Sequence, residues 1–165
     1  MTTTTRRFGH RLLRDIGAPV EGTIVGAAAV TIAGTHAHSA GLVTIAWAVV
    51  IVVYWLTHVY LHALRDQLSR QAAPLHRRLA DNAGLQIGVL VGGVPVILAY
   101  LAAVAVGLSL GDAVYVSIGW TIVQLGGTVF VASRAARLST RRALHESLIA
   151  SLLGFLLLGA KVLLH

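Results

Sequence analysis

Long stretches without a charged side chain constrain the fold of this chain more than any other feature. No Asp, Glu, Lys or Arg occurs between Glu21 and Arg65, between Asp81 and Asp112, or between Asp112 and Arg134. A helix rises about 1.5 Å per residue and the hydrocarbon layer of a bilayer is about 30 Å thick, so roughly 20 apolar residues are enough to cross it. These windows therefore predict membrane-spanning helices.

The windows predict an all-α protein: a polytopic transmembrane helix bundle that forms a single domain over residues 1–165. The first window holds two spans, because polar and small residues interrupt it from His36 to Gly41. Hydrophobic residues make up 56% of the sequence and charged residues only 12%, which is outside the usual composition of soluble domains. The five predicted spans cover about residues 18–36, 42–64, 85–107, 113–133 and 147–164.

The arginines predict the orientation of the bundle. They fall before the first span, between the second and third spans, and between the fourth and fifth, so all of them lie on one side of the membrane. The positive-inside rule makes that side cytoplasmic, with the N-terminus inside and the C-terminus outside. The net charge of +7 then follows from topology and does not indicate nucleic-acid binding. The arginines are Arg6, Arg7, Arg11, Arg14, Arg65, Arg70, Arg77, Arg78, Arg134, Arg137, Arg141 and Arg142.

The same features predict the partners of the chain. Arginines at a cytoplasmic surface attract anionic lipid headgroups, each by about 1 kcal/mol. Small residues in the first span, among them Gly22 and Gly26, allow a second helix to approach closely. They fit packing inside the bundle, a homo-oligomer, a partner membrane protein or a pore lining. We expect a multi-pass protein of the bacterial plasma membrane that binds no nucleic acid.

A proline and a glutamine are expected at the same depth, near the middle of the membrane. Pro95 of the third span removes one backbone amide and crowds the carbonyl of Val91, which then needs another partner in lipid. Gln124 of the fourth span lies at a similar depth and is the expected partner. Two interpretations stay open: Gln124 repairs a proline kink, or a helix broken at Pro95 lines a binding site.

One group of titratable residues is a candidate ion or proton site. His58 and His62 share a helical face of the second span with Tyr54 and Arg65, and Glu21 lies at a similar depth on the first span. Ionisable groups inside a membrane usually find a partner and mark ion or proton paths, and histidine changes charge near neutral pH. The alternative is that Glu21 orients the start of its helix while the histidines anchor theirs at the interface.

The sequence predicts no cofactor, no metal site and no enzymatic activity. His58 and His62 have the spacing to share a metal, but a third ligand would be needed, and no second deep histidine exists to ligate haem. The chain has no cysteine, no phosphate-binding glycine loop and no serine elbow. A few residues expected on the outer face are interpreted as solvated rather than ligating: His36, His38, Asp112 and His165.

Two segments resemble a known group of proteins. The stretch from Trp55 to Arg65, WLTHVYLHALR, and the C-terminal KVLLH from Lys161 are similar to small uncharacterised integral membrane proteins of actinobacteria. The resemblance implies a membrane protein over the whole length and adds no functional residue. The leading hypothesis is a channel or transporter-like protein for protons or small ions. The alternative is a non-transporting structural or accessory subunit that binds a partner helix and anionic lipid.

Overall fold

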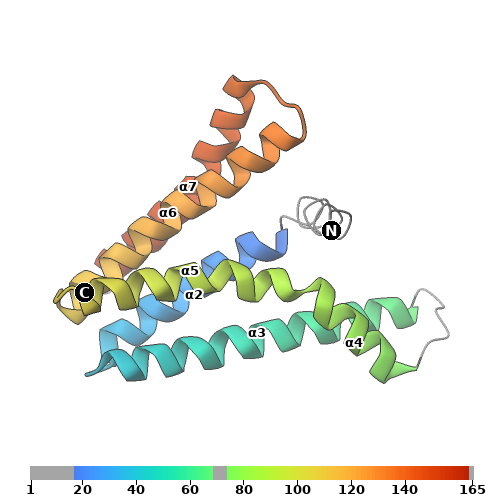
Figure 1. The fold of residues 1–165 in the computed structure, drawn as a ribbon, viewed down its shortest axis with the longest axis horizontal. Coiled ribbons are helices and arrows are strands. Elements are labelled where there is room, and N and C mark those ends of the chain that lie inside the picture. Colours follow the sequence, from blue (N-terminus) through green and yellow to red (C-terminus); the bar gives the residue numbers. More distant parts are fainter. Residues whose placement is uncertain (1–16, 69–73, 164–165) are drawn as a thin grey trace, which may run out of the picture.

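The computed structural model describes residues 17–68 and 74–163, and within these ranges the chain is entirely helical (Figure 1). The prediction of an all-α fold is therefore confirmed for the described residues. The helices are α2 (Gly17–His36), α3 (Ala40–Leu68), α4 (Leu75–Leu85), α5 (Ile87–Ala105), α6 (Leu110–Ala135) and α7 (Thr140–Leu163).

Four of the described helices are long and apolar enough to cross a membrane: α2, α3 as far as Gln67, α5 and α6. They cover the first four predicted spans, about 18–36, 42–64, 85–107 and 113–133. The fifth predicted span lies in α7, which is not among these four. The structure is therefore that of a membrane helix bundle with four candidate spans.

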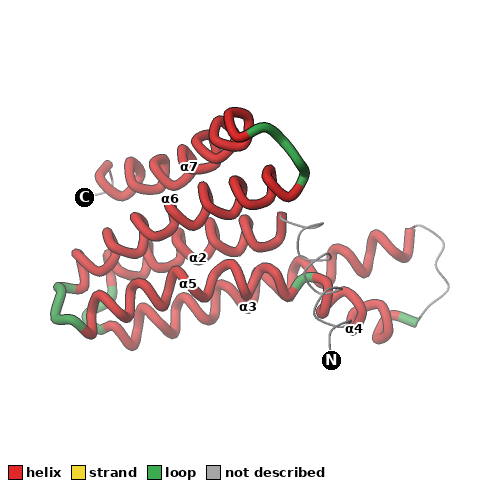
Figure 2. The backbone as a smooth tube through the Cα atoms, turned by 45° about the horizontal axis from the view of Figure 1, so that its top comes forward, coloured by secondary structure: helices red, strands yellow, loops and turns green. Residues whose placement is uncertain are grey.

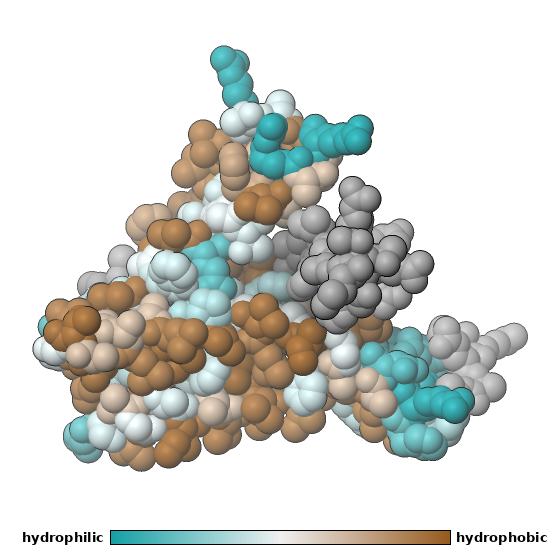
Figure 3. Space-filling view, in the orientation of Figure 1, coloured by the Kyte–Doolittle hydropathy of each residue, from teal (hydrophilic) through white to brown (hydrophobic). Residues whose placement is uncertain are grey.

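The bundle has two distinct ends. The α2–α3 and α5–α6 turns lie at one end, and the α3–α4 region and the α6–α7 turn lie at the other (Figures 1 and 2). Hydrophilic residues gather around α4 and the α6–α7 turn, whereas the visible face between the two ends is largely hydrophobic (Figure 3). Six exposed arginines lie at the second end, which we call the arginine end: Arg65, Arg77, Arg134, Arg137, Arg141 and Arg142.

The segment between the second and third predicted spans contains helical structure. α3 continues to Leu68, and α4 packs back against it. Nη1 of Arg78 donates to the carbonyl of Ala63 at 2.8 Å, and Nδ2 of Asn82 donates to Oδ2 of Asp66 at 2.8 Å. Arg78 was expected at the lipid-facing surface with the other arginines, but it is only 8% exposed because it is used in this packing.

α2 is the central helix and contacts α3, α5, α6 and α7. A Cβ atom at Gly22 would collide with the backbone carbonyl of Val89, and one at Gly26 would lie 3.1 Å from Cα of Gly93. The backbones of α2 and α5 therefore touch where side chains are missing, as small-residue membrane interfaces do. The glycine face of α2 is covered by α5 and lines no pore within the described residues.

α7 runs antiparallel to α6 and packs on it through small and polar side chains (Figure 1). The hydroxyl of Ser147 donates to the carbonyl of Gly126 at 2.7 Å, and that of Ser151 donates to the carbonyl of Ile122 at 3.3 Å. The leucines on the other side of α7 stay exposed: Leu148, Leu152, Leu153 and Leu156. α7 therefore lies at the periphery of the bundle.

Candidate functional site

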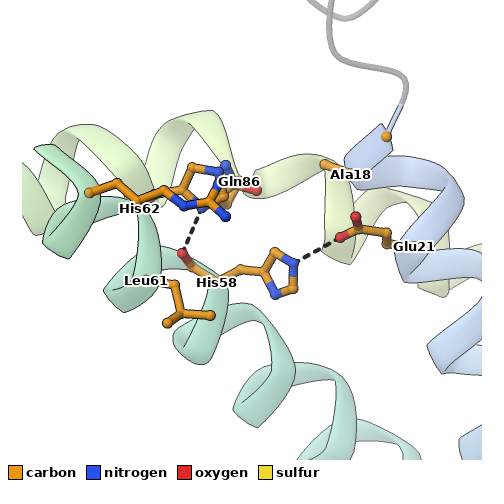
Figure 4. A pocket seen from close by; sticks show the side chains of 8 residues that line it. Ala18, Glu21, His58, Leu61, His62 and Gln86 are labelled. Atoms are coloured by element: carbon orange, nitrogen blue, oxygen red, sulfur yellow. Dashed lines mark hydrogen bonds and ion pairs between the residues drawn. The ribbon is translucent and has the colours of Figure 1, made fainter.

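Glu21 of α2 and His58 of α3 form a close pair at the arginine end of the bundle. Oε2 of Glu21 lies 2.8 Å from Nε2 of His58. The two side chains point toward one another from neighbouring helices (Figure 4). Both helices cross the bundle antiparallel and are joined by a short turn after His36, so residues near their far ends meet. The structure thus brings together two of the three residues of the predicted titratable site by a direct contact.

The hydrogen-bond pattern assigns the tautomer of His58. A carboxylate can only accept, so Nε2 of His58 carries the hydrogen that is donated to ionised Glu21. Nδ1 of His58 is buried and has no partner among the described residues.

His62 lies one helical turn beyond His58 and has a different pattern. Its Nδ1 lies 2.9 Å from the carbonyl oxygen of His58, and because a carbonyl only accepts, Nδ1 must be the donor. Nε2 of His62 is then the ring nitrogen that can accept a hydrogen bond. The rings of Tyr54 and His58 lie 4.5 Å apart between centroids, and those of His58 and His62 lie 6.2 Å apart. Three rings therefore follow one another along α3.

The pair and His62 share one pocket of about 240 Å³. Its lining comes from α2, α3 and the junction between α4 and α5: Gly17, Ala18, Glu21, His58, Leu61, His62, Arg65 and Gln86. No group of three or more His, Asp or Glu residues in the described part of the chain is placed to hold a metal ion. The side chains that line the pocket can exchange protons and form hydrogen bonds.

Gln86 is the pocket residue that the sequence argument missed. It lies at the break between α4 and α5 and is only 4% exposed, and its side chain lies beside that of His62 in Figure 4. The signal available was a single amide side chain at the cytoplasmic edge of an otherwise apolar predicted span. The break between the two helices is what turns this side chain into the pocket.

A second polar cluster lies where Pro95 and Gln124 were expected to meet. Nε2 of Gln124 donates to the carbonyl of Gly92 at 2.8 Å and to the hydroxyl of Thr23 at 2.9 Å. The Thr23 hydroxyl itself lies 3.0 Å from the same Gly92 carbonyl. Nε1 of Trp120 donates to Oε1 of Gln124 at 3.1 Å. The network joins α2, α5 and α6 near the middle of these helices.

Two details of the expectation around Pro95 need correction. α5 continues through Pro95 without interruption, and the break in this helical region falls at Gln86 instead. The carbonyl that Gln124 meets belongs to Gly92 and not to Val91. The reason is the orientation of α5: Gly92 is buried against α2, whereas Val91 is 54% exposed on the outward face.

The residues expected on the outer face have local partners or are exposed. Nδ1 of His36 lies 2.7 Å from the hydroxyl of Thr35, and His38 is exposed. The backbone amide of Asp112 donates to the hydroxyl of Ser109, the residue that caps α6. His165 lies outside the described residues.

The fold and the pocket define a class of protein: a small helical membrane bundle with a titratable pocket at its arginine end. Comparison with protein-family models, with curated proteins and with solved structures found no match. The resemblance of the Trp55–Arg65 segment to small actinobacterial membrane proteins stays a prediction.

Proposed function

We propose that this chain is a channel or transporter-like membrane protein for protons or small ions, and that the pocket with Glu21, His58 and His62 is its titratable site. The observation that supports this most is the 2.8 Å contact between Glu21 and His58, two titratable side chains on two of the candidate membrane spans. Ionisable side chains in membrane helices usually pair with one another and mark ion or proton paths.

The polar network around Gln124 supplies further hydrogen-bonding groups for such a path. Thr23 lies two residues beyond Glu21 on α2, about 3 Å further along the helix axis and on the opposite side of the helix, facing α5. It is hydrogen-bonded to Gln124 of α6, whose amide also reaches the Gly92 carbonyl of α5. Elsewhere the contact between α2 and α5 is closed by touching backbones. A path through one copy of the chain would therefore run from the pocket by way of Thr23 and Gln124.

The proposed topology has five spans, with the N-terminus inside and the C-terminus outside a bacterial plasma membrane. Two observations support it. The described exposed arginines share one end of the bundle, as the positive-inside rule requires. α7 also begins at that end and runs back along α6 toward the opposite end (Figure 2).

The test is proton flux from purified protein in liposomes, followed with a pH-sensitive dye with and without an imposed potential. We expect Glu21→Gln and His58→Ala to abolish flux, because each removes one side of the pair. Asp81→Asn and His76→Ala are matched controls, since both residues are exposed on α4 and neither lines the pocket. Both controls should keep wild-type flux.

Silence of the folded wild-type protein across proton, potassium and chloride gradients would contradict the proposal. It would favour the alternative, a structural or accessory subunit. In that case the partner has to bind elsewhere than at Gly22 and Gly26, which α5 already covers. The outward face of α3 offers a broad apolar surface for a second copy or another membrane protein: Ile45, Val49, Val52, Val53 and Leu56.

A further inference from the structure

The pocket contains nitrogen donors that have no partner. The guanidinium of Arg65 forms no ion pair with a carboxylate in the described part of the chain, although it lines the pocket. The amide of Gln86 also has no hydrogen-bond partner among residues 17–68 and 74–163, and Gln86 is 96% buried, since only 4% of it is exposed. The amide of Gln86 opens onto the pocket, so a molecule in the pocket can bond to it.

The pocket has few acceptors to match these donors. Its one carboxylate among the lining residues belongs to Glu21, and that carboxylate is already bonded to His58. Nδ1 of His62 is used by the backbone of His58, so Nε2 becomes a further donor as soon as it takes up a proton. The pocket therefore has more nitrogen donors than acceptors, since Arg65, Gln86 and His62 face only the Glu21 carboxylate and the Oε1 of Gln86.

We propose that the pocket binds a small monovalent anion through Arg65, Gln86 and protonated His62, so that an anion and a proton occupy it together. This proposal rests on the ion-handling function proposed above and names the ion. A volume of about 240 Å³ has room for a halide, nitrate or a short carboxylate. Guanidinium and imidazolium groups form charge-assisted hydrogen bonds to such ions.

The charges around the pocket give the binding a pH dependence. The charged and titratable groups around His62 are Glu21 on α2, His58, Arg65 and Asp66 on α3, and Arg78 on α4. A proton on His62 adds one positive charge to the pocket, which the anion balances. Because binding of the anion and binding of the proton favour one another reciprocally, anion affinity should rise as the pH falls through the range in which histidine gains its proton, about pH 8 to 5.

The experiment is a ³⁵Cl NMR titration of the full chain purified in detergent, with chloride as the probe and sodium gluconate to hold the ionic strength. We expect excess chloride line broadening that is several-fold larger at about pH 5.5 than at about pH 7.5. Arg65→Gln and His62→Phe should remove it, and Gln86→Leu should weaken affinity about tenfold. Arg77→Gln, at an exposed arginine outside the pocket, should leave it unchanged. Melting curves establish that each variant is folded.

Two outcomes would overturn the anion site. One is that the wild type shows no excess broadening at either pH, and the other is that the broadening persists in folded Arg65→Gln. The proposal that a proton on His62 accompanies the anion would be overturned by broadening that is equal at both pH values in the wild type and in His62→Phe. Proton flux without chloride binding would contradict this inference and leave the proposed function standing. Chloride binding without any flux would contradict the proposed function and leave the anion site standing.

Discussion

The side-chain amide of Gln124 on α6 donates to the backbone carbonyl of Gly92 on α5 over 2.8 Å, three residues before Pro95. The same amide donates to Thr23 on α2, so one glutamine connects three helices. Pro95 removes the helical donor of Val91 and not that of Gly92, so Gln124 gives a second hydrogen bond to a carbonyl of the continuous helix α5. The position of Gln124 therefore contributes both to stability and to the polar path proposed above.

Replacement of Gln124 by leucine should lower the free energy of unfolding by about 1 to 2 kcal/mol, because the Gly92 carbonyl and the Thr23 hydroxyl each lose a donor. Reversible denaturation in mixed micelles measures this change. The neighbouring Val123 is 66% exposed, so Val123→Leu is the matched control and should leave stability unchanged. Equal stability of Gln124→Leu and the wild type would show that the network does not hold the helices together.

Substitution of Gly22 by alanine should lower the free energy of unfolding by about 1 to 3 kcal/mol, because the added Cβ collides with the backbone of Val89 and pushes α2 away from α5. Gly127→Ala is the control within the same protein. A Cβ at Gly127 meets no atom within 4 Å, so this change should leave stability the same or raise it slightly. A tolerated Gly22→Ala would contradict the close contact of the two backbones.

Arg78→Ala should loosen α4 from α3, since it removes the donor to the Ala63 carbonyl and empties a buried position. Hydrogen bonds from charged groups contribute about 1.5 to 3 kcal/mol, which corresponds to at least a tenfold faster amide exchange in α4. Hydrogen exchange with mass spectrometry of residues 75–85 measures it. Arg77→Ala, at the adjacent exposed arginine, should exchange like the wild type.

The chain has no cysteine, so single introduced cysteines can report the topology without further changes. In intact cells an impermeant maleimide should label His38→Cys in the α2–α3 turn and should not label Thr140→Cys at the start of α7. His165→Cys decides between five spans and four: labelling places the C-terminus outside, and protection places it inside. Labelling of Thr140→Cys together with protection of His38→Cys would reverse the orientation.

Much of this fold could be predicted because charge-free windows are a local property of the chain. The ends of α2, α3, α5 and α6 lie within a few residues of the predicted spans. The contact between Glu21 and His58 was also within reach, since both depths follow from counting along two helices that a short turn makes antiparallel neighbours.

Other features depend on how the helices rotate and could not be predicted in this way. α4 carries charged residues on both its buried and its exposed sides, so its place against α3 is set by the specific bonds of Arg78 and Asn82. The choice of Gly92 over Val91 as the partner of Gln124 depends on which face α5 turns inward. A stripe of small residues such as Gly22 and Gly26 indicates that some helix comes close, but it does not indicate which one.

The partnership of α2 with α5 also constrains the order in which the protein is made. A ribosome synthesises α2 first, yet the glycines that cover it, Gly92 and Gly93, emerge some 70 residues later. α2 is the least hydrophobic of the four candidate spans. During translation the glycine face of α2 must therefore contact lipid or the insertion machinery until α5 has been synthesised. The interface between α2 and α5 can thus form only after the third candidate span has been synthesised.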